Sequence, residues 1–248
     1  MTNRITIAAC QLFDVQDDLE QSLAKIKEYA TQASEQGAAL VCFPESYLQG
    51  YTTKETPARE RALDISSPQF ADILKRLESL QPTLVIGFIE KAGAQLFISA
   101  AVVRQGTLLG CYRKTRLAPG ERLFDPGTET PTFEVEGLRF GVNICYELNL
   151  PECAATIASQ QAQLMVCPCY NMLHPENAEW WKHRHNAIRA ERTRETGLWL
   201  LSADVTGTRD GQIAYGPTAV IDPCGTVVAQ VPLMEEGLLL QEIRYESL

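Results

Sequence analysis

Three side chains in this sequence are of types that can act as a base, an oxyanion-stabilising cation and a nucleophile. Glu45 ends the apolar run VCFPE, Lys114 lies in the segment CYRKTRL, and Cys145 lies in the segment GVNICYE. A buried carboxylate can serve as a general base, a fixed cation can stabilise an oxyanion, and a thiolate can attack a carbonyl carbon.

Each of the three residues also has a plainer interpretation. Glu45 follows a buried strand, where ligand crevices often form, but a solvated loop glutamate would fit the same pattern. Lys114 could stabilise an oxyanion, or it could be a basic residue in solvent at the end of a hairpin strand. Cys145 precedes a helix expected to begin near Pro151, and a thiol at such a strand-to-helix turn can act as a nucleophile. The alternative for Cys145 is a buried packing cysteine.

The three segments together resemble the nitrilase, or carbon–nitrogen hydrolase, superfamily. The family's glutamate ends the pattern F-P-E, its lysine follows an aromatic residue and an arginine in R-K-x-x-L, and its cysteine lies in G-x-x-I-C-Y-[DE]. All three patterns occur here in the family's order. Further segments that resemble family landmarks are Phe124–Gly127, Arg189–Glu191, Ala203–Gly207 and Ile221–Gly225.

This resemblance implies a role for each residue. Cys145 would be the nucleophile, and Glu45 the base that takes its proton and later activates water. Lys114 would stabilise the tetrahedral oxyanion, assisted by the backbone N–H of Tyr146. Glu121 resembles an auxiliary carboxylate that positions the lysine or the substrate amide.

The resemblance also implies a fold and a place for the substrate. The expected fold is an α/β single domain over residues 1–248, built as an α-β-β-α sandwich and usually assembled as a homodimer. Tyr170 and Asn171, with Trp180 and Trp181, lie where the family tends to build its substrate pocket. The alternative for these aromatic residues is packing.

The predicted function is hydrolysis of a small amide to an acid and ammonia through a cysteine thioester, with no metal or other cofactor. Nitrile hydrolysis, N-carbamoyl hydrolysis and acyl transfer use the same core residues and stay open. A binding protein that has kept the fold without the chemistry is the alternative of a different class. Asn149 and Leu150 stand where many relatives carry an arginine and an aromatic residue, so the substrates of those relatives do not transfer directly.

Three arginines lie close to Lys114 in the sequence: Arg113, Arg116 and Arg122. In an otherwise acidic protein they suggest a substrate amide that bears a carboxylate. The alternative is that they face water or pair with neighbouring glutamates.

Hydrophobic spacing predicts alternating helices and strands. Apolar residues at helical spacing between Asp17 and Gly37 predict an amphipathic helix. The apolar run over residues 38–45 then suits a strand buried on both faces. A second helix and strand are expected over residues 70–80 and 83–90, which indicates a layered α/β fold.

Two further segments predict strands. Residues 1–10 alternate between polar and apolar positions, which indicates a first strand without a secretory signal pattern. Residues 101–109 resemble residues 219–228, and each segment is typical of a strand, a tight turn and a second strand. If this is a true internal repeat, it implies two sheets of similar construction.

Composition limits the partners and the location. The formal net charge of -9 would repel a phosphate backbone, so no nucleic acid partner is expected. The apolar stretch near Gly197 is far shorter than the roughly 20 residues needed to span a bilayer. The eight cysteines mostly lie in apolar segments, as expected of reduced thiols. We therefore expect a soluble cytoplasmic enzyme that acts on a small molecule.

Histidines and paired cysteines suggest two rival sites. A papain-like enzyme would need a histidine for Cys145, but His174, His183 and His185 cluster on one segment and no papain-type sequence surrounds the cysteine. Cys167 and Cys169, with His183 and His185, could suggest a metal, yet their spacing fits neither a zinc ribbon nor a zinc finger. We expect core thiols and a polar helix face there.

Overall fold

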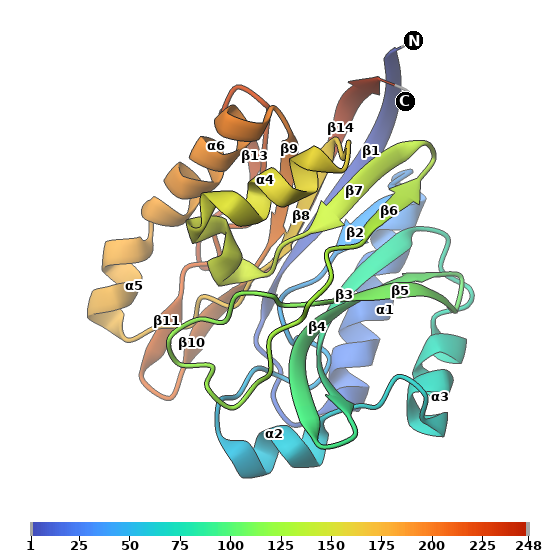
Figure 1. Cartoon of the computed structure of the whole chain (residues 1–248), viewed down its shortest axis with the longest axis vertical. Helices are drawn as coiled ribbons and strands as arrows, with labels where there is room; N and C mark the ends of the chain where they lie inside the picture. Colours follow the sequence, from blue (N-terminus) through green and yellow to red (C-terminus); the bar gives the residue numbers. More distant parts are fainter. Residues whose placement is uncertain (1, 247–248) are drawn as a thin grey trace.

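Two β-sheets form the centre of the structure, a computed structural model that describes residues 2–246 (Figure 1). The first sheet runs in the order β11-β10-β1-β2-β3-β4-β5, with β14 also paired to β1. Its strands are β1 (Thr2–Phe13), β2 (Leu40–Cys42), β3 (Thr83–Ala92), β4 (Gln95–Arg104), β5 (Thr107–Arg113), β10 (Val205–Arg209), β11 (Gln212–Ala214) and β14 (Gly237–Glu246). The second sheet runs in the order β13-β12-β9-β8-β7-β6. Its strands are β6 (Thr132–Val135), β7 (Leu138–Val142), β8 (Leu164–Pro168), β9 (Trp199–Ala203), β12 (Ala219–Ile221) and β13 (Val227–Gln230).

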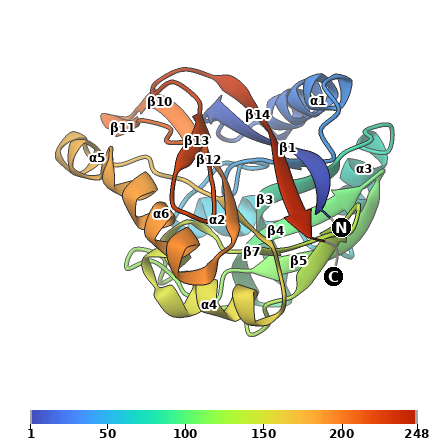
Figure 2. The ribbon, with the colours of Figure 1, turned by 90° about the horizontal axis from the view of Figure 1, so that it is seen from above.

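Helices cover the outer face of each sheet. The helices are α1 (Leu19–Glu35), α2 (Glu55–Arg61), α3 (Pro68–Arg76), α4 (Pro151–Ser159), α5 (Pro175–Trp181) and α6 (Arg184–Thr196), with a 3₁₀-helix, η1, over Cys145–Asn149. Figure 2 shows α1 and α4 on opposite sides of the strands. The predicted α-β-β-α sandwich is therefore confirmed.

Three apolar clusters hold these layers together. The inner faces of the two sheets meet in one cluster, which joins Ile7 and Val85 of the first sheet to Phe140 and Leu201 of the second. Successive residues of β1 point to opposite faces, so Ala8 packs instead toward the helices α1 and α3. A third cluster lies between the second sheet and the helices α4 and α6. Strands buried on both faces explain the continuous apolar runs in the sequence.

The local elements follow the sequence closely. The predicted helix after Asp17 is α1, and the carboxylate of Asp18 caps it by accepting a hydrogen bond from the backbone N–H of Gln21. The two segments predicted as strand, turn and strand are the antiparallel hairpins β4–β5 and β12–β13, each with a register shift. The predicted first strand is β1, although Met1 lies outside the described residues.

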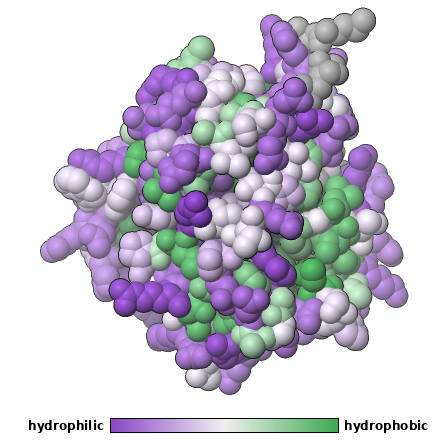
Figure 3. Space-filling model, viewed as in Figure 1, coloured by the Kyte–Doolittle hydropathy of each residue, from purple (hydrophilic) through white to green (hydrophobic). Residues whose placement is uncertain are grey.

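Several large apolar side chains are exposed, among them Phe13, Leu109 and Trp180. Figure 3 shows hydrophilic and hydrophobic residues side by side on the face seen in Figure 1. Among residues 2–246, no helix has both the length and the apolar composition needed to cross a membrane.

Candidate active site

The predicted site residues come from the carboxyl ends of strands. Glu45 follows β2, Lys114 directly follows β5, and Cys145 follows β7. Strands β2 and β3 are parallel, and two antiparallel pairings then make β5 run in the same direction as β3. Tyr170 and Asn171 follow β8, which is parallel to β7. The sheets therefore bring five predicted side chains to one edge, where ligands bind in many α/β folds.

Close backbone packing fixes the position of Glu45. Its backbone N–H donates to the carbonyl oxygen of Cys169 at 3.1 Å, which joins the first sheet to the second. On the other side lies Gly87 of β3, where an added Cβ would be 2.3 Å from the carbonyl oxygen of Pro44 and 2.7 Å from Cα of Glu45. Only glycine allows this approach. The side chain of Glu45 is 1% exposed.

Lys114 lies between two carboxylates. Its Nζ donates to Oε1 of Glu45 at 2.8 Å and to Oε1 of Glu121 at 2.7 Å. Glu121 is fixed in turn, because its Oε2 accepts from the backbone N–H of Ala118 at 2.6 Å and its Oε1 accepts from the hydroxyl of Tyr51 at 3.1 Å. All three charged side chains are almost completely buried. The predicted placement of Glu121 beside the lysine matches this geometry.

Cys145 occupies a strained turn. Its φ is +48°, a left-handed conformation that few residues other than glycine adopt. The turn starts η1, and α4 follows at Pro151 as expected. The thiol contacts the side-chain oxygen Oδ1 of Asn171 at 3.7 Å and the backbone oxygen of Tyr170 at 4.0 Å. This geometry places the side chain of Cys145 just beyond the end of β7, at the start of η1, where it lines a cavity.

Burial and neighbouring charges set the proton affinities of the three groups. Burial raises the pKa of Glu45 to about 7, against opposing contributions from Lys114 and from a hydrogen bond with Cys145. Burial alone would lower the pKa of Lys114, but the charges of Glu45 and Glu121 outweigh it and raise that pKa. A hydrogen bond with Cys169, together with burial, raises the pKa of the Cys145 thiol. The cavity therefore holds a protonated thiol together with a carboxyl group whose pKa lies near neutral pH.

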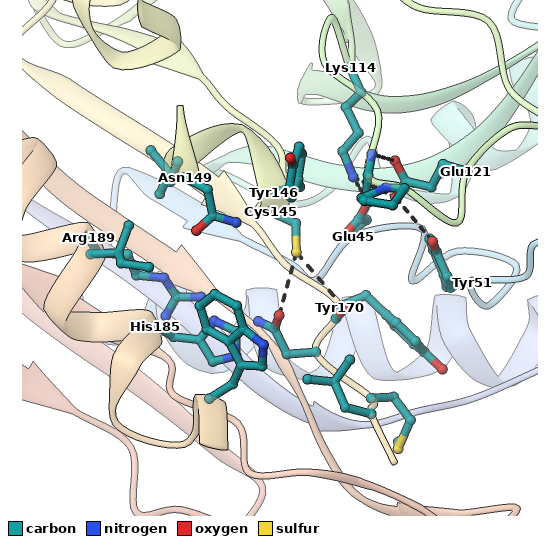
Figure 4. A pocket seen from close by; sticks show the side chains of 18 residues that line it. Glu45, Tyr51, Lys114, Glu121, Cys145, Tyr146, Asn149, Tyr170, His185 and Arg189 are labelled. Atoms are coloured by element: carbon teal, nitrogen blue, oxygen red, sulfur yellow. Dashed lines mark hydrogen bonds and ion pairs between the residues drawn. The ribbon is translucent and has the colours of Figure 1, made fainter. Parts of the chain in front are cut away.

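These side chains line one cavity of about 410 Å³. Figure 4 shows Glu45, Lys114 and Glu121 on one side of Cys145, and His185 and Arg189 on the other. The other residues that line the cavity are Tyr51, Ala118, Pro119, Tyr146, Leu148, Asn149, Tyr170, Asn171, Met172, Leu173, Trp181 and Ile188. All seven predicted site residues contribute to it, whereas Trp180 is 61% exposed and lies outside.

The wall beneath Cys145 is a buried polar network that the sequence did not reveal. Asp204 accepts hydrogen bonds from the backbone and side-chain N–H groups of Asn171. Arg189 lies 3.5 Å from Asp204 and donates to the sulfur of Cys169 at 3.0 Å. The pair holds Asn171 against the thiol. Asp204 lies within a segment that resembles a family landmark, which is the one sequence signal pointing to it.

Two further residues escaped the sequence analysis. Tyr51 donates to Glu121 and stacks on Tyr170 with ring centroids 4.6 Å apart. Glu147, two residues after Cys145, is completely buried and accepts hydrogen bonds from the backbone N–H groups of Thr115, just after β5, and Ile144, just after β7. Glu147 belongs to the cysteine motif, so its acidic character could have been used as a signal.

The arginines near Lys114 in sequence do not lie in the cavity. Arg113 binds the buried carboxylate of Glu90 and lies over the ring of Phe97, beside a second cavity. Arg116 lines a third cavity, and Arg122 is exposed. The expectation of a carboxylate-bearing substrate therefore loses its structural basis.

Comparisons with known proteins agree with this fold. The omega-amidase of Homo sapiens is 28% identical over 99% of this chain and 90% of that protein. An amidase from Nesterenkonia sp. matches with a TM-score of 0.82 and 26% identity, covering 96% of this chain and 90% of the other. A glutamine-dependent NAD+ synthetase from Acinetobacter baumannii has the same fold, with a TM-score of 0.85 and 22% identity, but this chain spans 45% of it.

The family match covers almost the whole sequence. Residues 6–248 match the carbon-nitrogen hydrolase family. The chain therefore belongs to the carbon-nitrogen hydrolase family, within the nitrilase superfamily, and is an amidase-like enzyme.

Proposed function

We propose that this enzyme hydrolyses a small amide to a carboxylic acid and ammonia, with Cys145 as nucleophile. Glu45 is the proton acceptor and donor, and Lys114 is the cation that stabilises the oxyanion. The observation that carries the proposal is the meeting of these three side chains in one cavity, where Nζ of Lys114 donates to Oε1 of Glu45 at 2.8 Å.

The first half of the reaction forms a thioester. Because the pKa of the Cys145 thiol is raised, the sulfur needs a base during attack, and Glu45 accepts its proton as the S–C bond forms. Negative charge then develops on the carbonyl oxygen, which Lys114 stabilises with the backbone N–H of Tyr146. Glu45 returns the proton to the nitrogen, the C–N bond breaks, and ammonia leaves.

The second half hydrolyses the thioester. Glu45, ionised again, takes a proton from water as the water oxygen attacks the acyl carbon. The C–S bond breaks, the sulfur regains the proton from Glu45, and the carboxylic acid leaves. Glu121 holds Lys114 from the other side throughout, because its carboxylate is fixed by Tyr51 and Ala118.

A relative supports the nucleophilic role. A variant of the Nesterenkonia amidase carries the acetamide moiety of fluoroacetamide covalently at its active-site cysteine. That amidase is 25% identical to this chain, and the match covers 96% of this chain and 90% of the amidase. Assembly as a homodimer and a cytoplasmic location stay predictions, which light scattering after size exclusion and cell fractionation would check.

The test is ammonia release from a panel of small amides, combined with intact-protein mass spectrometry during turnover. We expect a mass shift equal to the acyl group, confined to Cys145, and a hydroxamate when hydroxylamine replaces water. Cys145→Ala should form no adduct and release no ammonia, while Lys114→Ala should slow the reaction by about two to three decades.

The exposed Cys224 offers a matched control. Cys224→Ala should retain the wild-type rate and the adduct. Hydrolysis that survives in Cys145→Ala would mean that water attacks the amide directly, and release of ammonia from nitriles in preference to amides would replace the proposed substrate class.

A further inference from the structure

We propose that the cavity selects amides whose acyl part is uncharged and apolar, with Trp181 and His185 as the wall that contacts it. This inference rests on the amide hydrolysis proposed above and names its substrate class.

Both cations that line the cavity within the described part of the chain are already bound to carboxylates. Lys114 donates to Glu45 and to Glu121. Arg189 lies at 3.5 Å from Asp204, and its Nη1 donates to the backbone oxygen of Pro217 at 2.6 Å. The two cations, Lys114 and Arg189, are thus matched by three carboxyl groups, those of Glu45, Glu121 and Asp204. The site therefore has no surplus positive charge for an anionic substrate.

A nearby lysine is held outside the cavity. Lys182 borders a smaller adjoining cavity that shares His185 and Asn171 with the main one. Its Nζ lies 4.4 Å from the ring centroid of Tyr215 and 3.7 Å from the carboxylate of Glu179. These contacts direct its charge away from the substrate space.

The side of the cavity opposite Glu45 and Lys114 carries an aromatic and apolar surface beside the paired Arg189. Trp181 stacks on His185, with ring centroids 5.2 Å apart and planes 22° apart. Ile188 lies one turn further along α6 and lines the same wall. Burial lowers the pKa of His185 to about 3, so its imidazole is uncharged at neutral pH and contributes no cation there.

These features exclude a carboxylate on energetic grounds. An ionised carboxylate placed against this wall would lose its water and find no unpaired cation, which is strongly unfavourable. An apolar acyl group of the same shape would instead bury its surface against aromatic rings. The cavity of about 410 Å³ has the size of a small-molecule site and leaves room for a branched acyl chain.

A matched pair of amides tests the inference: the monoamide of glutaric acid, and 5-methylhexanamide, in which two methyl groups replace the carboxylate oxygens. We expect kcat/KM to be at least about 100-fold higher for 5-methylhexanamide, because the site offers the carboxylate no partner. An equal or higher kcat/KM for the glutaric acid monoamide overturns the inference but leaves the proposed hydrolysis intact.

Calorimetry separates this result from failure of the proposed function. In Cys145→Ala, where no turnover is expected, 5-methylhexanamide should bind more tightly than the glutaric acid monoamide. Tighter binding of the monoamide overturns the inference whether or not the wild type hydrolyses either compound. If the wild type hydrolyses neither amide, that result counts against the proposed function. The calorimetric comparison still decides the substrate class.

An added cation provides the converse test. Ile188→Arg should raise kcat/KM for the glutaric acid monoamide relative to 5-methylhexanamide by about tenfold or more, while the control Ile188→Met should keep the wild-type ratio. Lys182→Gln should leave the ratio unchanged. A large loss of monoamide hydrolysis in Lys182→Gln would show that this lysine binds the carboxylate and would overturn the inference.

Discussion

The carboxylate of Glu147 accepts a hydrogen bond from the backbone N–H of Thr115 at 2.8 Å, which ties the residue after Lys114 to the turn that carries Cys145. The same carboxylate accepts from the backbone N–H of Ile144 at 2.7 Å, directly before the cysteine. It also accepts a hydrogen bond from the hydroxyl of Tyr112 at 2.7 Å. One buried side chain thereby fixes the lysine and the cysteine relative to each other.

Glu147→Gln should therefore lower activity without removing a group that touches the substrate. In this variant an NH₂ group replaces one carboxylate oxygen, and an NH₂ group cannot accept a hydrogen bond. At least one of the buried N–H or O–H donors described above therefore loses its acceptor. We expect kcat to fall by about 100-fold with a smaller change in KM, because displacement of the lysine from the cysteine weakens transition-state contacts. Steady-state kinetics on an uncharged amide measures this split.

The exposed Glu152 on α4 supplies the control for that variant. Glu152→Gln should leave kcat, KM and the thermal midpoint close to the wild-type values. Wild-type kcat in Glu147→Gln would show that the carboxylate has no part in positioning the site.

The sequence predicted the parts of the site that depend on local patterns. Helix α1 and the hairpins follow from residue spacing, and the three segments around Glu45, Lys114 and Cys145 were found by their motifs. The contacts of Glu147 and Asp204 depend instead on how the strands pack, which no local pattern encodes.

The inference of a carboxylate-bearing substrate from the arginines near Lys114 lost its basis for a related reason. Arg113 and Lys114 are neighbours in sequence, but successive side chains on a strand point to opposite faces. Arg113 consequently reaches Glu90 in another cavity, while Lys114 reaches Glu45. Proximity in sequence at the end of a strand does not mean proximity in space.

Gly87→Ala should displace Glu45. The new Cβ would lie 2.3 Å from the carbonyl oxygen of Pro44 and 2.5 Å from the backbone nitrogen of Ser46, distances that backbone atoms do not tolerate. The turn must move, and a shift of about 1 Å at a catalytic group costs on the order of 100-fold in rate. Kinetics and thermal unfolding of the purified variant would measure both effects.

Gly93 separates this effect from a general loss of stability. Its φ is +62° and an added Cβ would meet no atom within 4 Å, so Gly93→Ala brings backbone strain without a clash. We expect a lower thermal midpoint with unchanged kcat/KM. If Gly87→Ala also keeps its kcat/KM, the close approach of β3 does not position Glu45.

The pH profile should report the ionisation of Glu45. Burial raises the pKa of this carboxyl to about 7, and it must be ionised to accept the thiol proton, so kcat/KM should rise about tenfold per pH unit below pH 7 and level off above it. The charge of Glu121 is one cause of the raised pKa. Removing that charge in Glu121→Gln should consequently move the acid limb to lower pH, even though the weaker support of Lys114 lowers the maximal rate. The measurement is kcat/KM for an uncharged amide from about pH 5 to about pH 9. Glu152→Gln should leave the limb in place, and an acid limb that stays fixed or moves to higher pH in Glu121→Gln would contradict the assignment of Glu45 as the base.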